Sequence, residues 1–357
     1  MSVYIIAEAG VNHNGSLELA KKLVEAAAEA GADAVKFQTF RAEKVASVLA
    51  KKAAYQQETT DAGESQVDML HKLELPLEAY PKLIALCKAK GVDFLSTPFE
   101  TDSLRFLVEE CHIQKVKVPS SEITNGPFLF EIARTGLPII LSTGMSTLSE
   151  VETALSVLAY GYLHDAMPSG SEDFVRAYGE AQTRGILREK ITLLHCTTEY
   201  PAPFDEVNLA AMDTMKRAFG LPVGYSDHTE GIAVPLAAAA RGAVIIEKHF
   251  TLDKMLPGPD HKASLAPDEL AEMVRGIRQI ENVIGNGCKA PTAREWANLA
   301  VVRKSLVAKR AIREGERFSA DNLAVKRPAS GMSPMCYWEL LGKRASRNYE
   351  ADEPIQE

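Results

Sequence analysis

Short β-rich runs alternate with longer helical patterns over most of this chain, and no other feature limits the possible fold as strongly. The β-rich runs are Tyr4–Ala9, Ala34–Thr39, Phe94–Pro98, Lys115–Pro119, Ile139–Thr143, Thr192–Thr197, Val223–Ser226 and Val244–Phe250. Strands that alternate with helices form parallel sheets, because a parallel connection needs a crossover. Eight such units predict a (β/α)8 TIM barrel, with a doubly wound open sheet as the alternative.

The pattern changes after Gly285, where a second region begins. Residues 286–302 indicate a linker with one short helix, and residues 303–357 hold short β runs separated by turn residues. We therefore expect a barrel domain over residues 1–285, then the linker, then a small β-rich domain over residues 303–357. Such a domain is near the lower size limit for independent stability.

Two connections within the predicted barrel are too long to be ordinary loops. Tyr160–Lys190 follows a helix and precedes a strand, so it should lie on the opposite, non-catalytic face. The other, Thr39–Pro76, is rich in Lys, Gln, Thr, Asp and Ser. Because it follows a strand, it belongs to the face where barrel active sites form. We expect it to act as a lid or a substrate-recognition segment.

Composition excludes several classes of partner. The 40 Lys and Arg against 48 Asp and Glu give a formal net charge of −8, which disfavours nucleic-acid binding. The five cysteines form no Cys-x-x-Cys pair, so neither a disulfide framework nor a thiolate metal site is expected. The longest apolar tract, Ile232–Ile246, is broken by Pro235 and Arg241, and no leader pattern is visible. We expect a cytoplasmic protein with no membrane partner.

Polar side chains stand at the C-terminal end of every predicted strand. They are Glu8, Lys36, Gln38, Thr97, Lys117, Ser120, Glu122, Ser142, Thr198, Tyr200, Ser226, His228 and His249. In a barrel these ends converge on one pocket. Lys36 and Lys117 each follow a valine and stand among hydroxyl groups, a combination that suits a phosphate or a carboxylate.

Two histidines, His228 and His249, end neighbouring predicted strands, and a βαβ unit brings such ends into one crevice. Imidazole suits a divalent cation, and Asp227, Glu247 and Asp260 could complete or orient such a site. The alternative is that both histidines are half-buried and satisfied by backbone carbonyls.

Two other classes of function stay open at this point. One is a Schiff-base aldolase, in which Lys36 or Lys117 would attack pyruvate. The other is not enzymatic: the small C-terminal domain would bind carbohydrate or ice beside an inert barrel.

Nine ordered motifs resemble the sialic acid synthase family. They are IIAEAGVNHNGS (5–16), VKFQTF (35–40), STPF (96–99), KVPSSE (117–122), LSTGM (141–145), HCTTEYP (195–201), GYSDHT (224–229), EKHFT (247–251) and GPDHKAS (258–264). The segment VAKRAIREGERFSADNLAVKRP (307–328) is similar to the antifreeze-like (SAF) domain, a β-clip fold, of those synthases. The resemblance implies a metal-dependent condensation of phosphoenolpyruvate with an N-acylated mannosamine-type sugar and water, releasing phosphate by C–O cleavage.

The resemblance also implies a role for each strand-end residue. His228 and His249 would bind Mn²⁺ or Mg²⁺, and Glu122 would position or deprotonate the attacking water, with Glu8 and Lys117 also catalytic. Arg327 would reach the sugar's acyl group from the other subunit, which requires a swapped homodimer. The remaining residues would hold the two substrates. Phosphoenolpyruvate would be bound by Lys36, Thr97, Lys117, Ser120, Ser142 and Ser226. The sugar or the metal would be contacted by Glu8, Gln38, Thr198, Tyr200 and Asp260.

Recognition of the sugar's distal end is left open by the motifs. Thr198 stands where one branch of the family has Asn, and Thr39–Pro76 contains no Asn, so the candidates there are Gln57, Thr59, Asp61 and Ser65. The motifs resemble both N-acetylneuraminate and legionaminic acid synthases. We predict N-acetylneuraminate, made from N-acetylmannosamine, as the product. The alternative product is legionaminic acid, made from 2,4-diacetamido-2,4,6-trideoxymannose.

Overall fold

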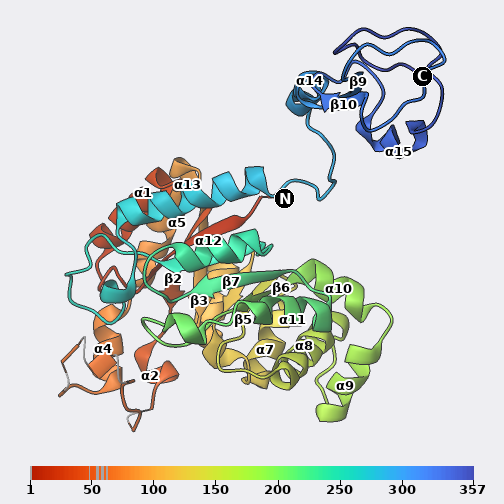
Figure 1. Ribbon diagram of the computed structural model, residues 1–357. Coiled ribbons are helices and arrows are strands. Elements are labelled where there is room, and N and C mark those ends of the chain that lie inside the picture. The colour runs from red at the N-terminus through yellow and green to blue at the C-terminus, as the bar shows by residue number, and fades with distance from the viewer. Residues whose placement is uncertain (1, 48, 54–55, 58–59, 62) are drawn as a thin grey trace. The chain divides into compact units, whose positions relative to one another are not determined.

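In the computed structural model, eight parallel strands pair in the order β3-β2-β1-β8-β7-β6-β5-β4 (Figure 1). The strands are β1 (Tyr4–Gly10), β2 (Ala34–Thr39), β3 (Asp93–Pro98), β4 (Val116–Val118), β5 (Ile139–Ser142), β6 (Ile191–His195), β7 (Val223–Asp227) and β8 (Ile245–His249). The first strand pairs with the last, and β4 packs against β3, which brings the sheet close to a closed ring. The predicted (β/α)8 barrel is confirmed. The doubly wound alternative is wrong, because its first and last strands would not pair.

The structure describes residues 2–47, 49–53, 56–57, 60–61 and 63–357. The chain divides into two compact units, Met1–Gly285 and Asn286–Glu357. The further separation of a linker from the C-terminal domain stays a prediction. In the part of the chain that is described, no helix combines the length and the apolar character needed to cross a membrane.

The interior of the ring changes from apolar to polar along the strands. Ile6, Leu95, Ile140, Leu194 and Ile245 are buried together inside the barrel. Side chains of a strand return to the same face every second residue. The residues two positions further along these strands are Glu8, Thr97, Ser142, Cys196 and Glu247. The apolar cluster is therefore the floor on which a polar layer stands.

Helices cover the outside of the sheet (Figure 1). The barrel helices are α1 (Leu17–Glu29), α5 (Tyr80–Lys90), α6 (Thr101–Arg105) with the π-helical turn η2 (Phe106–Glu110), α7 (Gly126–Arg134), α8 (Leu148–Leu163), α11 (Ala210–Phe219), α12 (Ala233–Ala240) and α13 (Pro267–Val283). Two more, α9 (Ser171–Gly179) and α10 (Thr183–Lys190), fill the connection between α8 and β6. Ser16 caps α1 by accepting from the Leu19 N–H, and Thr147 and Glu150 form a capping box on α8.

The long connection after β2 forms an excursion outside this ring of helices, and we call residues 40–76 the insert. It contains α2 (Ala42–Val45) and α4 (Gln66–Leu73). Its own small core joins Phe40, Met69 and Leu73 to Val11, which follows β1. Because these contacts start where β1 and β2 end, the insert lies at the C-terminal face of the barrel, as the chain order predicted.

The second unit contains α14 (Ala293–Val302), a two-stranded antiparallel sheet of β9 (Ser305–Ala308) and β10 (Leu323–Lys326), and α15 (Tyr337–Leu340). Its core gathers Leu306, Ala308, Ile312, Phe318, Leu323, Leu340, Ala345, Tyr349 and Ile355. Isolated bridges such as Ile312 to Tyr349 join the remaining loops. The unit is small and β-rich, as predicted.

A pair of helical glycines tests the packing of the barrel helices. A Cβ on Gly161 of α8 would lie 2.6 Å from the Ala133 Cβ of α7. We expect Gly161→Ala to destabilise the fold by about 1–3 kcal/mol, because the two helices must separate. Gly185 in α10 has no atom within 4 Å of such a Cβ, so Gly185→Ala should instead stabilise by about 0.5–1 kcal/mol. Urea unfolding followed by circular dichroism measures both, and equal stabilities would contradict the close approach of α7 and α8.

Candidate active site

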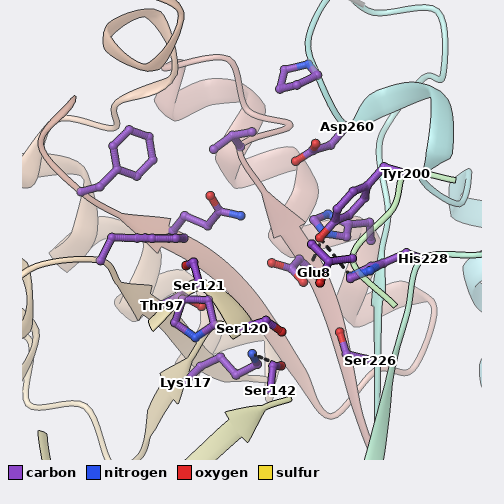
Figure 2. Close-up of a pocket in the computed structure, with 18 of the residues that line it drawn as sticks. Glu8, Thr97, Lys117, Ser120, Ser121, Ser142, Tyr200, Ser226, His228 and Asp260 are labelled. Carbon is purple, nitrogen blue, oxygen red and sulfur yellow. Dashed lines mark hydrogen bonds and ion pairs between the residues drawn. The ribbon is translucent and has the colours of Figure 1, made fainter. Parts of the chain in front are cut away.

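A cavity of about 330 Å³ opens at the C-terminal ends of the strands. Of the residues predicted from the strand ends and the loop after β8, those that line it are Glu8, Lys36, Gln38, Thr97, Lys117, Ser120, Ser142, Thr198, Tyr200, Ser226, His228, His249 and Asp260. Figure 2 shows Tyr200, His228 and Asp260 on one side of it and Lys117, Ser142 and Thr97 on the other. The ring thus brings together residues that are up to 252 positions apart in the chain, from Glu8 to Asp260.

Two predicted residues lie elsewhere. Glu122, in the turn after β4, does not line the cavity, and its Oε2 accepts a hydrogen bond from the Asn125 side chain at 2.7 Å. Arg327 belongs to the second unit, where it is exposed just after β10. The barrel unit alone therefore presents neither group to the cavity.

The two lysines form the cationic part of the cavity. Lys117 Nζ donates to Ser142 Oγ at 2.6 Å and to the Val118 carbonyl at 3.2 Å. Lys36 Nζ donates to Glu8 Oε1 at 2.5 Å and to Thr97 Oγ1 at 3.1 Å. Both side chains are almost completely buried, so their charges act in a medium where electrostatic interactions are strong. Each ammonium is held in place by at least one hydroxyl before any ligand arrives.

A carboxylate, Glu247, lies between the two lysines. Its Oε1 is 3.7 Å from Lys117 Nζ and its Oε2 is 3.7 Å from Lys36 Nζ, while Ser226 Oγ donates to Oε1 at 2.9 Å. Sequence analysis assigned Glu247 only to the surroundings of a metal. Its position two residues before His249 on one strand places both on the same face, and that signal could have found it.

These charges shift one another's pKa values. Burial lowers the pKa of Lys36, but Glu247 and Glu8 raise it more, so the net shift is upward. For Lys117, burial and the nearby Lys36 outweigh the pull of Glu247, and its pKa is lowered. Burial raises the pKa of Glu8, but His249 and Lys36 lower it by a larger amount. The net shift of the Glu8 pKa is downward, so Glu8 stays ionised. Lys117 is therefore the lysine that gives up its proton more readily.

The two histidines face one another at the other side of the cavity. Their ring centroids are 5.8 Å apart. His228 Nδ1 lies 2.6 Å from the Thr197 carbonyl oxygen, which can only accept, so Nδ1 carries the proton and Nε2 holds the lone pair. The Tyr200 hydroxyl lies 3.2 Å from that Nε2. Burial, followed by the charge of His249, lowers the pKa of His228 to about 3, so the ring is neutral at neutral pH.

The donor set fits a divalent metal ion. His228 has a lone pair aimed into the cavity, and its other nitrogen is oriented by a backbone carbonyl, an arrangement usual for metal-binding imidazoles. The buried Nδ1 of His249 has no hydrogen-bond partner among the described residues. Gly10 leaves room beside this ring, since a Cβ there would lie 3.2 Å from His249 Nδ1. Asp260 adds a buried carboxyl, whose pKa is raised by burial.

Asp227, named from the sequence as a neighbour of this site, faces the other way. Its Oδ2 accepts from Lys248 Nζ at 2.5 Å, and both side chains are buried outside the ring. The reason is the alternation along β7 and β8: Ser226 and Glu247 point inward, so the next residue of each strand points outward. Asp227 and Lys248 therefore form a structural ion pair, and the expectation for Asp227 was wrong.

A second group of ligand-type side chains lies outside the cavity, on the insert. One ligand atom each from Glu43, His71 and Glu74 falls within 4.8 Å of the others. Glu74 already accepts from Arg41 Nη1 at 3.3 Å and from the Ala42 N–H at 2.7 Å, and His71 pairs with both carboxylates. Because these contacts satisfy the group without an ion, we interpret it as a set of polar contacts that holds α2 against α4.

The insert also contributes lining residues that sequence analysis missed. Gln56 and Gln66 line the cavity, whereas the candidates Gln57, Asp61 and Ser65 do not, and Thr59 lies outside the described residues. Gln57 instead donates to the Lys52 carbonyl, and Ser65 caps α4. Further lining comes from apolar side chains, namely Val11, Phe40, Val45, Met69, Leu70, Leu73 and Phe99. The α4 side chains repeat at helical spacing, a signal that the sequence carried.

Comparison with known proteins gives consistent matches along the whole chain. The sequence model of the NeuB family matches residues 23–289, and that of the SAF domain matches residues 303–357. The N,N'-diacetyllegionaminic acid synthase of Campylobacter jejuni is 54% identical over 99% of this chain and 98% of its own length. The synthase of the same name from Legionella pneumophila is 44% identical over 98% and 92%. A solved N-acetylneuraminic acid synthetase from Leptospira borgpetersenii superposes with a TM-score of 0.67 at 33% identity, over 84% and 90%.

Charge substitutions test the anion-binding part of the cavity with inorganic phosphate as the probe. Lys117→Met should weaken phosphate binding at least tenfold, because a charge-assisted hydrogen bond contributes about 1.5–3 kcal/mol. Glu247→Gln should strengthen it, because one negative charge leaves the space between two ammonium groups. Lys115→Met is the matched control: this lysine directly precedes β4, does not line the cavity and lies over the Tyr4 ring. Isothermal titration calorimetry measures all three, and weaker binding by Glu247→Gln would contradict the assignment.

Proposed function

The chain belongs to the NeuB family and is an enzyme that catalyses a condensation, and from this premise we propose that it makes N,N'-diacetyllegionaminic acid. The substrates would be phosphoenolpyruvate, 2,4-diacetamido-2,4,6-trideoxymannose and water. The observation that carries the proposal is the cavity itself, where two buried lysines and two buried imidazoles, from β2, β4, β8 and the residue after β7, share one space.

The proposed reaction forms a bond between C3 of phosphoenolpyruvate and C1 of the open-chain aldehyde, whose oxygen takes a proton and becomes a hydroxyl. C2 of phosphoenolpyruvate is left with positive charge, and water adds there. The tetrahedral product then breaks the bond from C2 to its phosphate-bearing oxygen. Phosphate leaves with that oxygen, and the water oxygen becomes the new ketone. Of the protons of the water, one balances the new hydroxyl and the other leaves with phosphate or to solvent.

The lysines would bind the anionic donor. Lys36 and Lys117, with Thr97, Ser120, Ser142 and Ser226, would hold the carboxylate and the phosphate of phosphoenolpyruvate. The Lys117 ammonium would stabilise the negative charge that grows on the departing phosphate, an effect of about 3 kcal/mol for a well-placed donor. The lowered pKa of Lys117 also supports its giving a proton to that phosphate.

The histidine side of the cavity would hold the sugar aldehyde and a divalent metal ion, Mn²⁺ or Mg²⁺. We propose His228 and His249 as its ligands. The ion would supply Lewis-acid polarisation of the aldehyde oxygen. Glu8 would stay ionised and orient Lys36 and His249, while Asp260, whose pKa burial raises, is the cavity carboxyl better suited to hold a proton near that oxygen. Gln38, Thr198 and Tyr200 would contact the sugar hydroxyl groups.

The base for the attacking water stays a prediction. Glu122 was proposed from the family resemblance, yet its carboxylate contacts Asn125 and does not line the cavity. Glu122 would have to turn away from Asn125 to reach the water.

The sequence motifs alone favoured N-acetylmannosamine as the acceptor, whereas the similarity to known synthases favours the diacetamido sugar. Two relatives with the name N,N'-diacetyllegionaminic acid synthase match this chain at 54% and 44% identity, against 33% for the N-acetylneuraminic acid synthetase. These likenesses support the diacetamido sugar as the acceptor. N-acetylneuraminate synthesis is the second candidate, and a Schiff-base reaction of Lys117 with pyruvate is the remote one.

The reaction is tested with metal-stripped protein, phosphoenolpyruvate and each sugar, before and after Mn²⁺ is added. We expect phosphate release only when the sugar and the metal are both present, with 2,4-diacetamido-2,4,6-trideoxymannose preferred. Phosphoenolpyruvate with heavy oxygen in the bridging position should pass its label to phosphate, because the C–O bond breaks. Label in the ketone, or a lysine adduct with pyruvate trapped by borohydride, would contradict the proposed chemistry.

We also propose a swapped homodimer, in which Arg327 serves the cavity of the partner subunit. Arg327 is exposed at the end of β10 in its own unit, which leaves its guanidinium available to a ligand. Its planar donors suit the acyl oxygen of the sugar.

Mixed subunits test this arrangement. Co-expressed Arg327→Ala and His249→Ala chains should recover activity that neither has alone, because about a quarter of the cavities in randomly paired dimers combine intact residues from two chains. Phosphate release by the purified mixture measures the recovery. Activity no higher than that of the separate variants would show that Arg327 does not act across subunits.

A further inference from the structure

The insert gives the cavity one apolar side. Along α4, the residues that line the cavity are Gln66, Met69, Leu70 and Leu73. Their spacing of three, four and seven positions places them on a single face of the helix. The positions between them, Val67, Asp68, His71 and Lys72, do not line it. The helix therefore turns one mainly apolar face to the space where substrates would bind.

Three more apolar side chains continue this surface. They are Phe40 after β2, Val45 on α2 and Phe99 after β3. The rings of Phe40 and Phe99 meet edge to face with centroids 6.1 Å apart. We call Phe40, Val45, Met69, Leu70, Leu73 and Phe99 the apolar wall.

Only part of the apolar wall is already covered by its own packing. Met69 and Leu73 are 2% and 6% exposed, so they serve mainly as the core of the insert. Leu70 and Phe99 are half-buried, and Val45 is exposed, although all three line the cavity. These three side chains retain apolar surface that a bound molecule would cover.

We propose that the apolar wall determines which sugar the enzyme accepts, by binding the methyl-bearing end of a 6-deoxy, 4-acetamido acceptor. This inference rests on the proposed function. The histidines stand at the ends of β7 and β8, whereas the apolar wall begins at the ends of β2 and β3, two residues beyond Gln38 and Thr97. An acceptor whose aldehyde lies at the histidines extends its far end away from them, and the apolar wall is the surface of the cavity that lacks charge.

The chemistry of the two candidate sugars differs at that far end. N-acetylmannosamine has hydroxyl groups at C4 and C6, which would lose their water against the apolar wall. The diacetamido sugar has a methyl group at C6 and an acetyl group at C4, and it offers an amide to the Gln66 side chain. A difference of this kind in an apolar pocket changes kcat/KM by roughly 10–200-fold. The apolar wall therefore favours the 6-deoxy diacetamido sugar.

Leu70→Gln tests the proposal, because it places an amide of similar length on the half-buried part of the apolar wall. We expect the ratio of kcat/KM for the diacetamido sugar to that for N-acetylmannosamine to fall about tenfold or more. The KM for phosphoenolpyruvate should not change. Val67→Gln is the matched control on the same helix, off the cavity-lining face, and should keep the wild-type ratio. N-acetylmannosamine without its C6 hydroxyl serves as a third acceptor, which separates the effect of the C6 methyl from that of the C4 acetamido group.

Val45→Thr is a second variant that guards against misfolding, because it exchanges a methyl for a hydroxyl at an exposed position of α2. It should lower the same ratio in the same direction. An unchanged ratio in both Leu70→Gln and Val45→Thr, with phosphate release intact, would overturn the inference and leave the proposed function standing. If the wild-type protein releases no phosphate with any sugar, the proposed function fails. Calorimetry with each sugar in the presence of Mn²⁺ then tests the wall directly, and equal affinities for wild type and Leu70→Gln would overturn it.

Discussion

The alternation of side chains along eight strands in a nearly closed ring is the constraint on which the site depends. Ile6, Leu95 and Ile245 fill the ring, and the residues two positions further along, Glu8, Thr97 and Glu247, meet above them. A strand can place a charged side chain in this polar layer because the preceding residues on the same face are apolar and fill the barrel interior beneath it. The same alternation sends Asp227 and Lys248 outward, where they pair with each other.

Charge compensation is the second condition for this cavity. Removing one partner from a buried ion pair costs about 3–5 kcal/mol, because the remaining charge is left without water or a counterion. Here Lys36 contacts Glu8 and Glu247, and Lys117 contacts Glu247 and Ser142. The cavity therefore keeps two cations ready for an anionic donor while the empty protein remains folded. Burial lowers the pKa of both lysines, but the two carboxylates next to Lys36 outweigh burial and raise its pKa, whereas at Lys117 burial and the charge of Lys36 prevail and its pKa is lowered.

The insert adds a different kind of surface to this charged interior. Barrel enzymes commonly vary their loops while the ring holds the reacting groups, because loops can change without disturbing the core. In this protein the insert has its own core, and polar contacts through Glu74 hold α2 against α4. Helix α4 can therefore present a defined face to the cavity. The strand ends of the barrel would thus carry out the reaction, and the insert of the same unit would select the substrate.

Much of this molecule was determined by local sequence pattern. Runs of β-forming residues separated by helical segments predicted the barrel, and the polar residue ending each run predicted the groups that meet in the cavity, because both are periodicities of a few residues. Tertiary structure alone decided that Glu247 lies between two lysines from β2 and β4, and that Gln66 and Leu70 rather than Gln57 face the cavity. Those outcomes depend on how the ring closes and on how a long insert packs back on it. Such contacts join residues far apart in the chain, and no local pattern encodes them.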